Sequence, residues 1–150
     1  MKFERFLEET NRLLKSCPQQ SKELSDDPLV LAYLGDAWFS LYVRSNLIAR
    51  GKYKVRVLQG LEGKIVSAEC QAIAWRELES EWTLEEQECF RRGRNASPSR
   101  GRGGSDYRTS TGYEAVLGFL IENNQKERLE QIAEKSLRVI LNFLKDQGGK

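Results

Sequence analysis

The sequence predicts an all-α protein, and three observations lead to that prediction. Apolar residues recur at three- and four-residue spacing in several segments, which is the period of a helix. Helix-capping signals, such as Thr83 followed by Glu86, stand directly before some of these segments. No segment alternates apolar and polar residues clearly enough to indicate a strand. A length of 150 residues suits one domain with one core.

The first predicted helix is amphipathic and covers residues 3–14, where apolar residues repeat at helical spacing. Cys17-Pro18 ends it, because proline disfavours a helical residue before it. Residues 19–26 are polar and are predicted to form a linker. Asp27 is then a predicted N-cap, and Pro28 takes the first helical position, where a missing N–H costs nothing.

The second predicted helix runs from Asp27 to about Arg44, with a short further turn toward residues 50–51. Residues 52–56 alternate charged and apolar side chains, and we expect a loop or a short turn there. Apolar positions between about Leu61 and Ser80 fit a third, long helix.

A capping box formed by Thr83 and Glu86 predicts the start of the next helix. Residues 93–105 are rich in Gly, Ser and Arg without an apolar anchor, which predicts a loop. Two final helices are expected over residues 111–123 and 126–146, because apolar periodicity returns there.

The composition excludes several classes of protein. With 39% apolar and 31% charged residues, the chain is predicted to be globular and soluble. No apolar run approaches the ~20 residues of a membrane span, so we expect no membrane association. The N-terminal segment lacks the unbroken apolar stretch of a signal peptide, which favours a cytoplasmic location, although a removed transit peptide would leave no trace.

The chain contains no histidine and three cysteines. Without histidine, it cannot form the Ser-His or Cys-His pairs of many hydrolases, and a zinc hydrolase is disfavoured. The cysteines are odd in number and widely spaced, which argues against a disulfide framework. Hydrolytic chemistry would therefore depend on carboxylates, hydroxyls, lysine or a hard cation.

One carboxylate, Asp36, interrupts the apolar run of the second predicted helix. An ionised side chain in apolar surroundings costs several kcal/mol unless something pairs with it. Two interpretations follow from the residues alone. Asp36 either holds a cation or forms a structural ion pair with an arginine.

Positive charge is concentrated in residues 91–108, which contain six arginines and one acid, Asp106. Such asymmetry favours contact with a polyanion. Three interpretations are open: a disordered segment that aids solubility, a single-strand binder, or a loop that enters a groove of duplex RNA. A second basic cluster could contact phosphate or form a solvated face, and it comprises Arg44, Arg50, Lys52, Lys54 and Arg56.

Two short patterns resemble the signature helices of the ribonuclease III family, which read roughly E-x-L-G-D-A and D-A-x-E-A. Residues 32–37 read AYLGDA, and residues 111–115 read TGYEA. Asp36 and Glu114 match the second acid of each pattern, whereas Ala32 and Thr111 replace the first. Glu114 also stands three residues after Thr111, so the residues alone favour a capping box there, whereas the family pattern favours a metal ligand.

The chain is most similar to Mini-ribonuclease III, a short branch of that family that lacks the same two acids. Further resemblance is found, in the order and approximate spacing of the family, in VSAECQA (66–72), RRGRNA (91–96) and STGYEA (110–115). The similarity covers about Asp27 to Leu144. We therefore expect a ribonuclease III-like domain over residues 25–146, with residues 1–24 outside it.

This resemblance implies a magnesium-dependent endoribonuclease that cuts double-stranded RNA, with manganese as an alternative cation. Asp36 and Glu114 would be the catalytic, metal-binding residues, since Mg²⁺ accepts one or two carboxylates and keeps several waters. The family is homodimeric and typically trims precursor ribosomal RNA of the large subunit. The RNA-contacting residues implied are Arg91, Arg92, Arg94, Asn95, Arg100, Arg102 and Arg108.

Two other functions are kept open. A catalytically silent, dimeric RNA-binding protein could use the same fold, although retention of Asp36 and Glu114 argues against it. A helical protein–protein adaptor would bind no RNA. The large aromatic residues are expected in the core or a dimer contact, for which Trp38 and Phe39 are candidates; the others are Trp75, Tyr113 and Phe119.

Overall fold

A computed structural model describes residues 2–16, 26–98 and 104–148. The described residues form helices only, which confirms the predicted all-α class. In chain order these are α1 (Lys2–Ser16), α2 (Pro28–Ala49), α3 (Val55–Ile65), α4 (Ala68–Glu77), a short 3₁₀ turn (Glu79–Glu81), α5 (Leu84–Ala96), α6 (Gly104–Glu122) and α7 (Lys126–Gly148).

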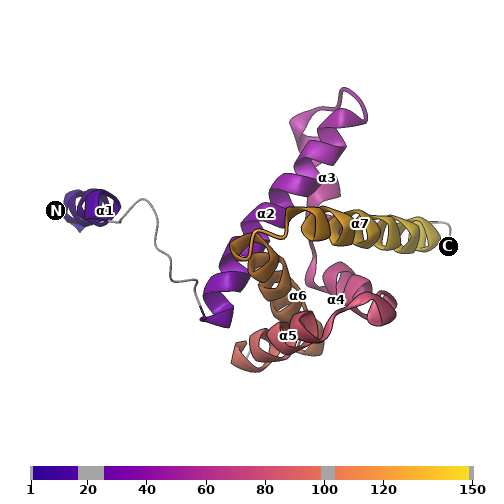
Figure 1. The fold of residues 1–150 in the computed structure, drawn as a ribbon. Coiled ribbons are helices and arrows are strands. Elements are labelled where there is room, and N and C mark those ends of the chain that lie inside the picture. Colours follow the sequence, from indigo (N-terminus) through magenta and orange to yellow (C-terminus); the bar gives the residue numbers. More distant parts are fainter. Residues whose placement is uncertain (1, 17–25, 99–103, 149–150) are drawn as a thin grey trace.

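Helix α6 is the centre of the fold. It contacts α2, α4, α5 and α7, and Figure 1 shows it crossing α2 beside α5. Nine of its residues are buried, and Tyr113, Val116 and Leu117 have no exposed surface. From residue 109 to residue 122 none of its residues is exposed, so this part of α6 is surrounded by the other helices.

Glycines allow α2 and α6 to cross with their backbones in contact. A Cβ atom on Gly35 would lie 1.9 Å from the carbonyl oxygen of Glu114. A Cβ atom on Gly118 would lie 1.9 Å from the carbonyl oxygen of Leu31. No side chain larger than hydrogen fits at either position while the helices stay this close. The crossing therefore fixes the residues beside these glycines relative to one another.

The predicted helix starts are confirmed at two capped positions. The carboxylate of Asp27 accepts a hydrogen bond from the Leu29 amide at 2.9 Å, and Pro28 opens α2. The capping box of α5 is complete, with Thr83 accepting from the Glu86 amide at 3.1 Å. Helix α2 continues to Ala49, so its further turn belongs to the same helix.

Of two predicted elements between residues 52 and 80, one is confirmed in part and one is wrong. The predicted loop or short turn over 52–56 is confirmed for residues 52–54 and ends there, because α3 begins at Val55. The long helix over 61–80 is two helices, since α3 ends at Ile65 and α4 begins at Ala68. Ser67 separates them: its hydroxyl caps α4 by accepting from the Cys70 amide at 3.2 Å. Apolar periodicity continues across this break because both helices pack on the same core.

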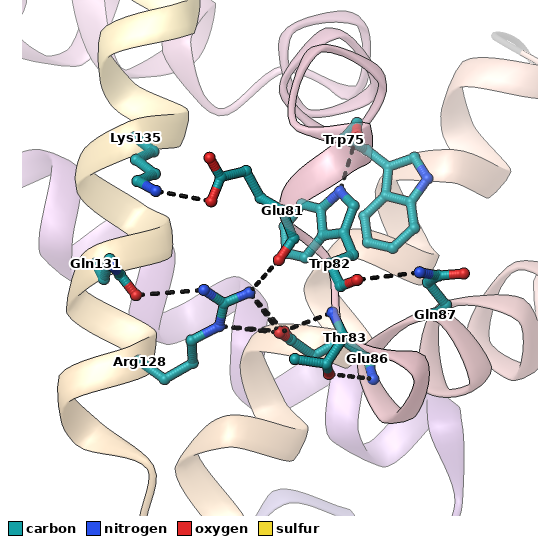
Figure 2. Close-up of polar contacts among 9 residues, drawn as sticks. All are labelled: Trp75, Glu81, Trp82, Thr83, Glu86, Gln87, Arg128, Gln131 and Lys135. Atoms are coloured by element: carbon teal, nitrogen blue, oxygen red, sulfur yellow. Dashed lines mark hydrogen bonds and ion pairs between the residues drawn. The ribbon is translucent and has the colours of Figure 1, made fainter.

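A buried ion pair joins α7 to the start of α5. Figure 2 shows Arg128 reaching both carboxylate oxygens of Glu86, at 2.7 and 3.1 Å from Nη2, and the backbone carbonyl of Glu81 at 2.6 Å. Glu86 is only 2% exposed. A charge buried this deeply needs a partner, and this pairing holds the connection between α4 and α5 against α7.

Helix α1 covers its predicted segment but buries none of its residues. Figure 1 draws it apart from the other helices. Most of the predicted linker lies outside the described residues, which resume at Asp26. The exposed large apolar side chains of α1 are Phe3, Phe6, Leu7, Leu13 and Leu14.

Candidate active site

Asp36 and Glu114 lie together where α2 crosses α6. Each stands beside the backbone contact, Asp36 directly after Gly35 and Glu114 one turn before Gly118. Asp36 is exposed, whereas Glu114 is partly buried. Burial, the charge of Asp36 and a hydrogen bond between the two carboxyl groups, in that order of size, together raise the pKa of Glu114 to about 9. The two acids are therefore close neighbours, although they are 78 residues apart in the sequence.

Among the residues that the structure describes, neither carboxylate is paired with a basic side chain. The salt bridges of the described residues include neither Asp36 nor Glu114. The alternative in which Asp36 is a structural acid bonded to an arginine thus has no support in the described part of the chain. Within the same residues, no group of three or more Asp, Glu, His or Cys side chains gathers around a common point. The centre consists of two carboxylates.

This donor set fits a hard divalent cation. Mg²⁺ takes oxygen ligands, is often held by one or two carboxylates, and fills its remaining positions with water and substrate phosphate. A partly buried carboxyl group beside one that is open to solvent supplies such a pair. A bound cation would offset both the burial and the charge of Asp36 that raise the pKa of Glu114, and so favour its ionised form.

The alternative in which Thr111 and Glu114 form a capping box is wrong. Helix α6 begins at Gly104, so Thr111 lies in its third turn rather than at its start. The Thr111 hydroxyl is 3.1 Å from the Tyr107 carbonyl and 3.3 Å from the Ser97 hydroxyl. It therefore bonds within the protein at a position where the larger family has an acid.

The predicted arginine-rich loop is shorter than expected. Helix α5 continues to Ala96 and α6 already begins at Gly104, which leaves residues 97–103 between them. Gly93 is buried inside α5, where a Cβ atom would lie 2.8 Å from the Cβ of Ala115. Gly93 therefore allows α5 to pack closely on α6. From the sequence alone, such a glycine cannot be distinguished from a glycine in a loop.

The structure distributes the predicted RNA-contacting residues over two helices. Arg91, Arg92, Arg94 and Asn95 are exposed on α5, and Arg108 is half-buried on α6. Arg100 and Arg102 lie outside the described residues.

Several of these arginines also bond within the protein. Arg91 pairs with Glu88, and Arg92 donates to the Asp26 carbonyl at 2.6 Å. Arg108 donates to the Arg94 carbonyl at 3.5 Å, and the Arg94 guanidinium lies 5.8 Å from the centre of the Phe90 ring.

The sequence did not indicate one further arginine near those of α5 and α6. Arg76, in the last turn of α4, pairs with Asp106, in the first turn of α6, at 2.5 Å. The two are 30 residues apart, and only the packing of α4 against α6 brings them together. No spacing or motif in the sequence could have indicated the pair.

The second basic cluster and the large aromatic residues have mixed outcomes. Arg44 forms a 2.8 Å ion pair with the buried Glu62, so it is a structural residue. The aromatic residues are a separate matter. Phe39 and Tyr113 have no exposed surface, and their ring centres lie 5.6 Å apart in an edge-to-face contact. Phe39 is therefore wrong as a dimer contact, because its own core covers it. Trp38 is half-buried and stacks on Tyr42.

Comparison with known proteins identifies the class of this fold. Residues 29–125 match the model of the Ribonuclease III domain. A solved crystal structure of a protein from Fusobacterium nucleatum has a TM-score of 0.69 with 22% identity, covering 76% of this chain and 93% of that one. The class is thus a ribonuclease III-type endoribonuclease.

Curated relatives define the branch of that class. Mini-ribonuclease 3 from a Thermoanaerobacter species is 38% identical, over 90% of this chain and 94% of its own length. Mini-ribonuclease 3 from Staphylococcus aureus is 40% identical, over 76% of this chain and 89% of its own. The protein from Brevibacillus brevis is 36% identical, over 81% and 96%. The chain belongs to the Mini-ribonuclease 3 family. None of the helices in the described residues is long and apolar enough to cross a membrane.

Proposed function

We propose that this endoribonuclease cleaves double-stranded RNA with magnesium held by Asp36 and Glu114, and that it matures precursor ribosomal RNA of the large subunit. The observation that carries the proposal is the position of Asp36 and Glu114 at the α2–α6 crossing. Among the described residues neither has a basic partner, and Asp36 is close enough to raise the pKa of Glu114. Manganese suits the same oxygen ligands and remains an alternative cation.

The protein residues supply position and charge in this proposal. Gly35 and Gly118 let the two backbones touch, so Asp36 and Glu114 are held near each other by two helices rather than by a loop. Burial on the α6 side limits the motion of Glu114, whereas exposed Asp36 leaves the centre open to a large substrate. When bound, a divalent cation supplies charge stabilisation to the scissile phosphate and activates water for attack. No histidine is required.

An exposed apolar stripe on α2 supports a homodimer. Val30, Tyr33, Leu41 and Ile48 are 48, 80, 63 and 64% exposed. They follow the helical period along one face, and Ala37 between them is also exposed. An apolar stripe of this length is typical of a surface that another chain covers. Asp36 is next to Ala37, so two copies joined along this stripe would bring two centres near one duplex.

The arginines of α5 and α6 are the proposed RNA surface. Arg91, Arg94 and Asn95 are exposed on α5, and Glu88 is the acid paired with Arg91. Duplex RNA is recognised mostly through shape, phosphates and 2′-hydroxyls, for which arginine side chains on a rigid helix are suited. Arg100 and Arg102 are assigned to this surface from the family resemblance.

The decisive experiment is cleavage of a perfect RNA duplex with and without magnesium. We expect the wild-type chain to cut both strands, Asp36→Asn to be inactive, and Glu127→Gln, an exposed acid at the start of α7, to be fully active. A wild-type chain that binds duplex RNA but never cuts it would instead identify the silent RNA-binding protein. Activity of Asp36→Asn close to wild type would refute the assignment of the centre.

A further inference from the structure

A groove between α4 and α5 contains three arginines. It has a volume of about 600 Å³, and Arg76, Arg91 and Arg94 line it together with Glu79. Its floor is aromatic, formed by Trp75, Trp82 and Phe90. This groove does not include the two-carboxylate centre.

The aromatic floor is rigid and offers no ring face to a ligand. Trp75 stacks on Phe90 at 3.7 Å and on Trp82 at 4.3 Å, so both of its faces are covered. Arg94 lies over the Phe90 ring. Figure 2 shows how the floor is held: the Trp82 indole donates to the Trp75 carbonyl, and Gln87 donates to the Trp82 carbonyl, both at 3.0 Å. A nucleobase could not stack here, which leaves the arginines as the groups that can recognise a ligand.

Arg76 has a partner that it can exchange. Its guanidinium bonds Asp106, and the two side chains are 53 and 37% exposed. Ion pairs this exposed contribute little to folding, so separating them costs little. Guanidinium binds phosphate oxygens in the same forked geometry as carboxylate oxygens. Asp106 is also the single acid among the six arginines of residues 91–108.

The groove lies within reach of a duplex bound at the centre. Asp106 and Glu114 are eight residues apart on α6, which is about 12 Å along the helix axis and places the two side chains within about a quarter turn of each other. One RNA duplex could therefore contact both places at once.

We propose that this groove binds a backbone phosphate of duplex RNA, and that Arg76 releases Asp106 to hold that phosphate. Asp106 then restrains binding in two ways. It pairs with Arg76 in the free protein, and its carboxylate repels the RNA after Arg76 has moved to the phosphate. The inference rests on the proposed RNA substrate but names a subsite and a restraining residue that the cleavage centre does not require.

Opposite effects of two substitutions test this exchange. Binding of a fluorescent RNA duplex is measured by anisotropy in EDTA, so that no cleavage occurs, at several salt concentrations. We expect Arg76→Gln to weaken binding and to flatten the log–log salt dependence by up to about one unit; one phosphate contact corresponds to roughly a threefold change between about 50 and 200 mM salt. Asp106→Asn should tighten binding by a similar factor. A purely structural ion pair predicts the same direction for both variants, because each breaks the same bond.

The matched control is the exposed pair of Arg138 and Glu134 on α7, which is 72 and 66% exposed. Arg138→Gln and Glu134→Gln make the same changes in net charge without touching the groove, and we expect both to leave binding unchanged. Equal shifts of RNA affinity in this control pair would overturn the subsite, and so would shifts of Arg76→Gln and Asp106→Asn in the same direction. The proposed function would stay intact in either case, provided that the wild-type chain binds and cleaves the duplex. Absence of wild-type binding would overturn both. Thermal unfolding of each variant establishes that it is folded.

Discussion

Two regions of the molecule differ in how their charged side chains are held. One is the α2–α6 crossing, and the other is the arginine surface, formed by Arg76 of α4, Arg91 and Arg94 of α5, and Arg108 of α6. At the crossing, backbones touch at Gly35 and Gly118, and two acids lie together without a basic partner among the described residues. On the arginine surface, charged side chains are exposed and pair with partners within the protein, as Arg76 does with Asp106. In the proposed function the first region needs fixed geometry, because Mg²⁺ tolerates little error in the position of its ligands. The second needs charge and reach, because a polyanion offers many equivalent contacts.

The comparison also separates stability from function. Glu114 is held in a partly buried position beside another acid, which disfavours its charged form and thus the folded state. Glu86 is more deeply buried, yet it is bonded to Arg128 and contributes to the fold. A partly buried acid without a basic partner is more informative about function than a buried one with such a partner.

The largest effect is expected from Glu114→Gln. Removing one of the two proposed metal-binding carboxylates should abolish cleavage of duplex RNA in magnesium. In metal-free buffer the same change removes an acid that burial and the charge of Asp36 disfavour in its ionised form, so the free energy of unfolding should stay equal or increase. Urea unfolding in EDTA and a cleavage assay test the two halves separately. Loss of stability together with activity would mean that Glu114 supports the fold rather than the chemistry.

Gly118→Ala should have the largest effect on folding. Its new Cβ would lie 1.9 Å from the Leu31 carbonyl oxygen, so α2 and α6 must separate. We expect a loss of about 3 kcal/mol in the free energy of unfolding, the upper end of overpacking costs. Gly63→Ala on α3 is the control, because no atom lies within 4 Å of its new Cβ. That variant should be up to about 1 kcal/mol more stable. Equal stability of the two variants would contradict the close crossing.

Tyr33→Glu tests the assembly of two centres. Tyr33 is 80% exposed on the apolar stripe of α2, and a charge there should prevent another copy from covering it. We expect a dimer mass for the wild-type chain and a monomer mass for the variant by light scattering at micromolar concentration. Leu84→Glu is the control, since Leu84 is 83% exposed but lies on α5, away from the stripe. A wild-type monomer with full activity would refute the dimer.

The sequence predicted the first region better than the second. The helix starts at Asp27 and Thr83 followed from local capping chemistry, which neighbouring residues determine. Asp36 and Glu114 were found because each lies in a recognisable family pattern. The break at Ser67 was missed because apolar residues keep the same period on both sides of it. The full extent of α6 was missed because a glycine in a helix cannot be distinguished, in the sequence, from a glycine in a loop. The Arg76–Asp106 pair depends on tertiary packing alone and left no local signal.

The smallest effect is expected from Arg94→Gln, and it tests whether the arginine surface acts on binding alone. Arg94 is exposed on α5, and its side chain is free of any salt bridge in the described structure. Its loss should raise the Michaelis constant for duplex RNA and flatten the salt dependence of binding by up to about one unit, while the rate at saturating RNA is unchanged. Arg138→Gln is again the control, because it removes the same charge from α7. Uniform binding interactions affect the Michaelis constant without changing saturated turnover, whereas interactions made only in the transition state lower turnover. A collapse of the saturated rate with normal affinity would therefore move Arg94 from the binding surface into the cleavage centre, and the division between the two regions would fail.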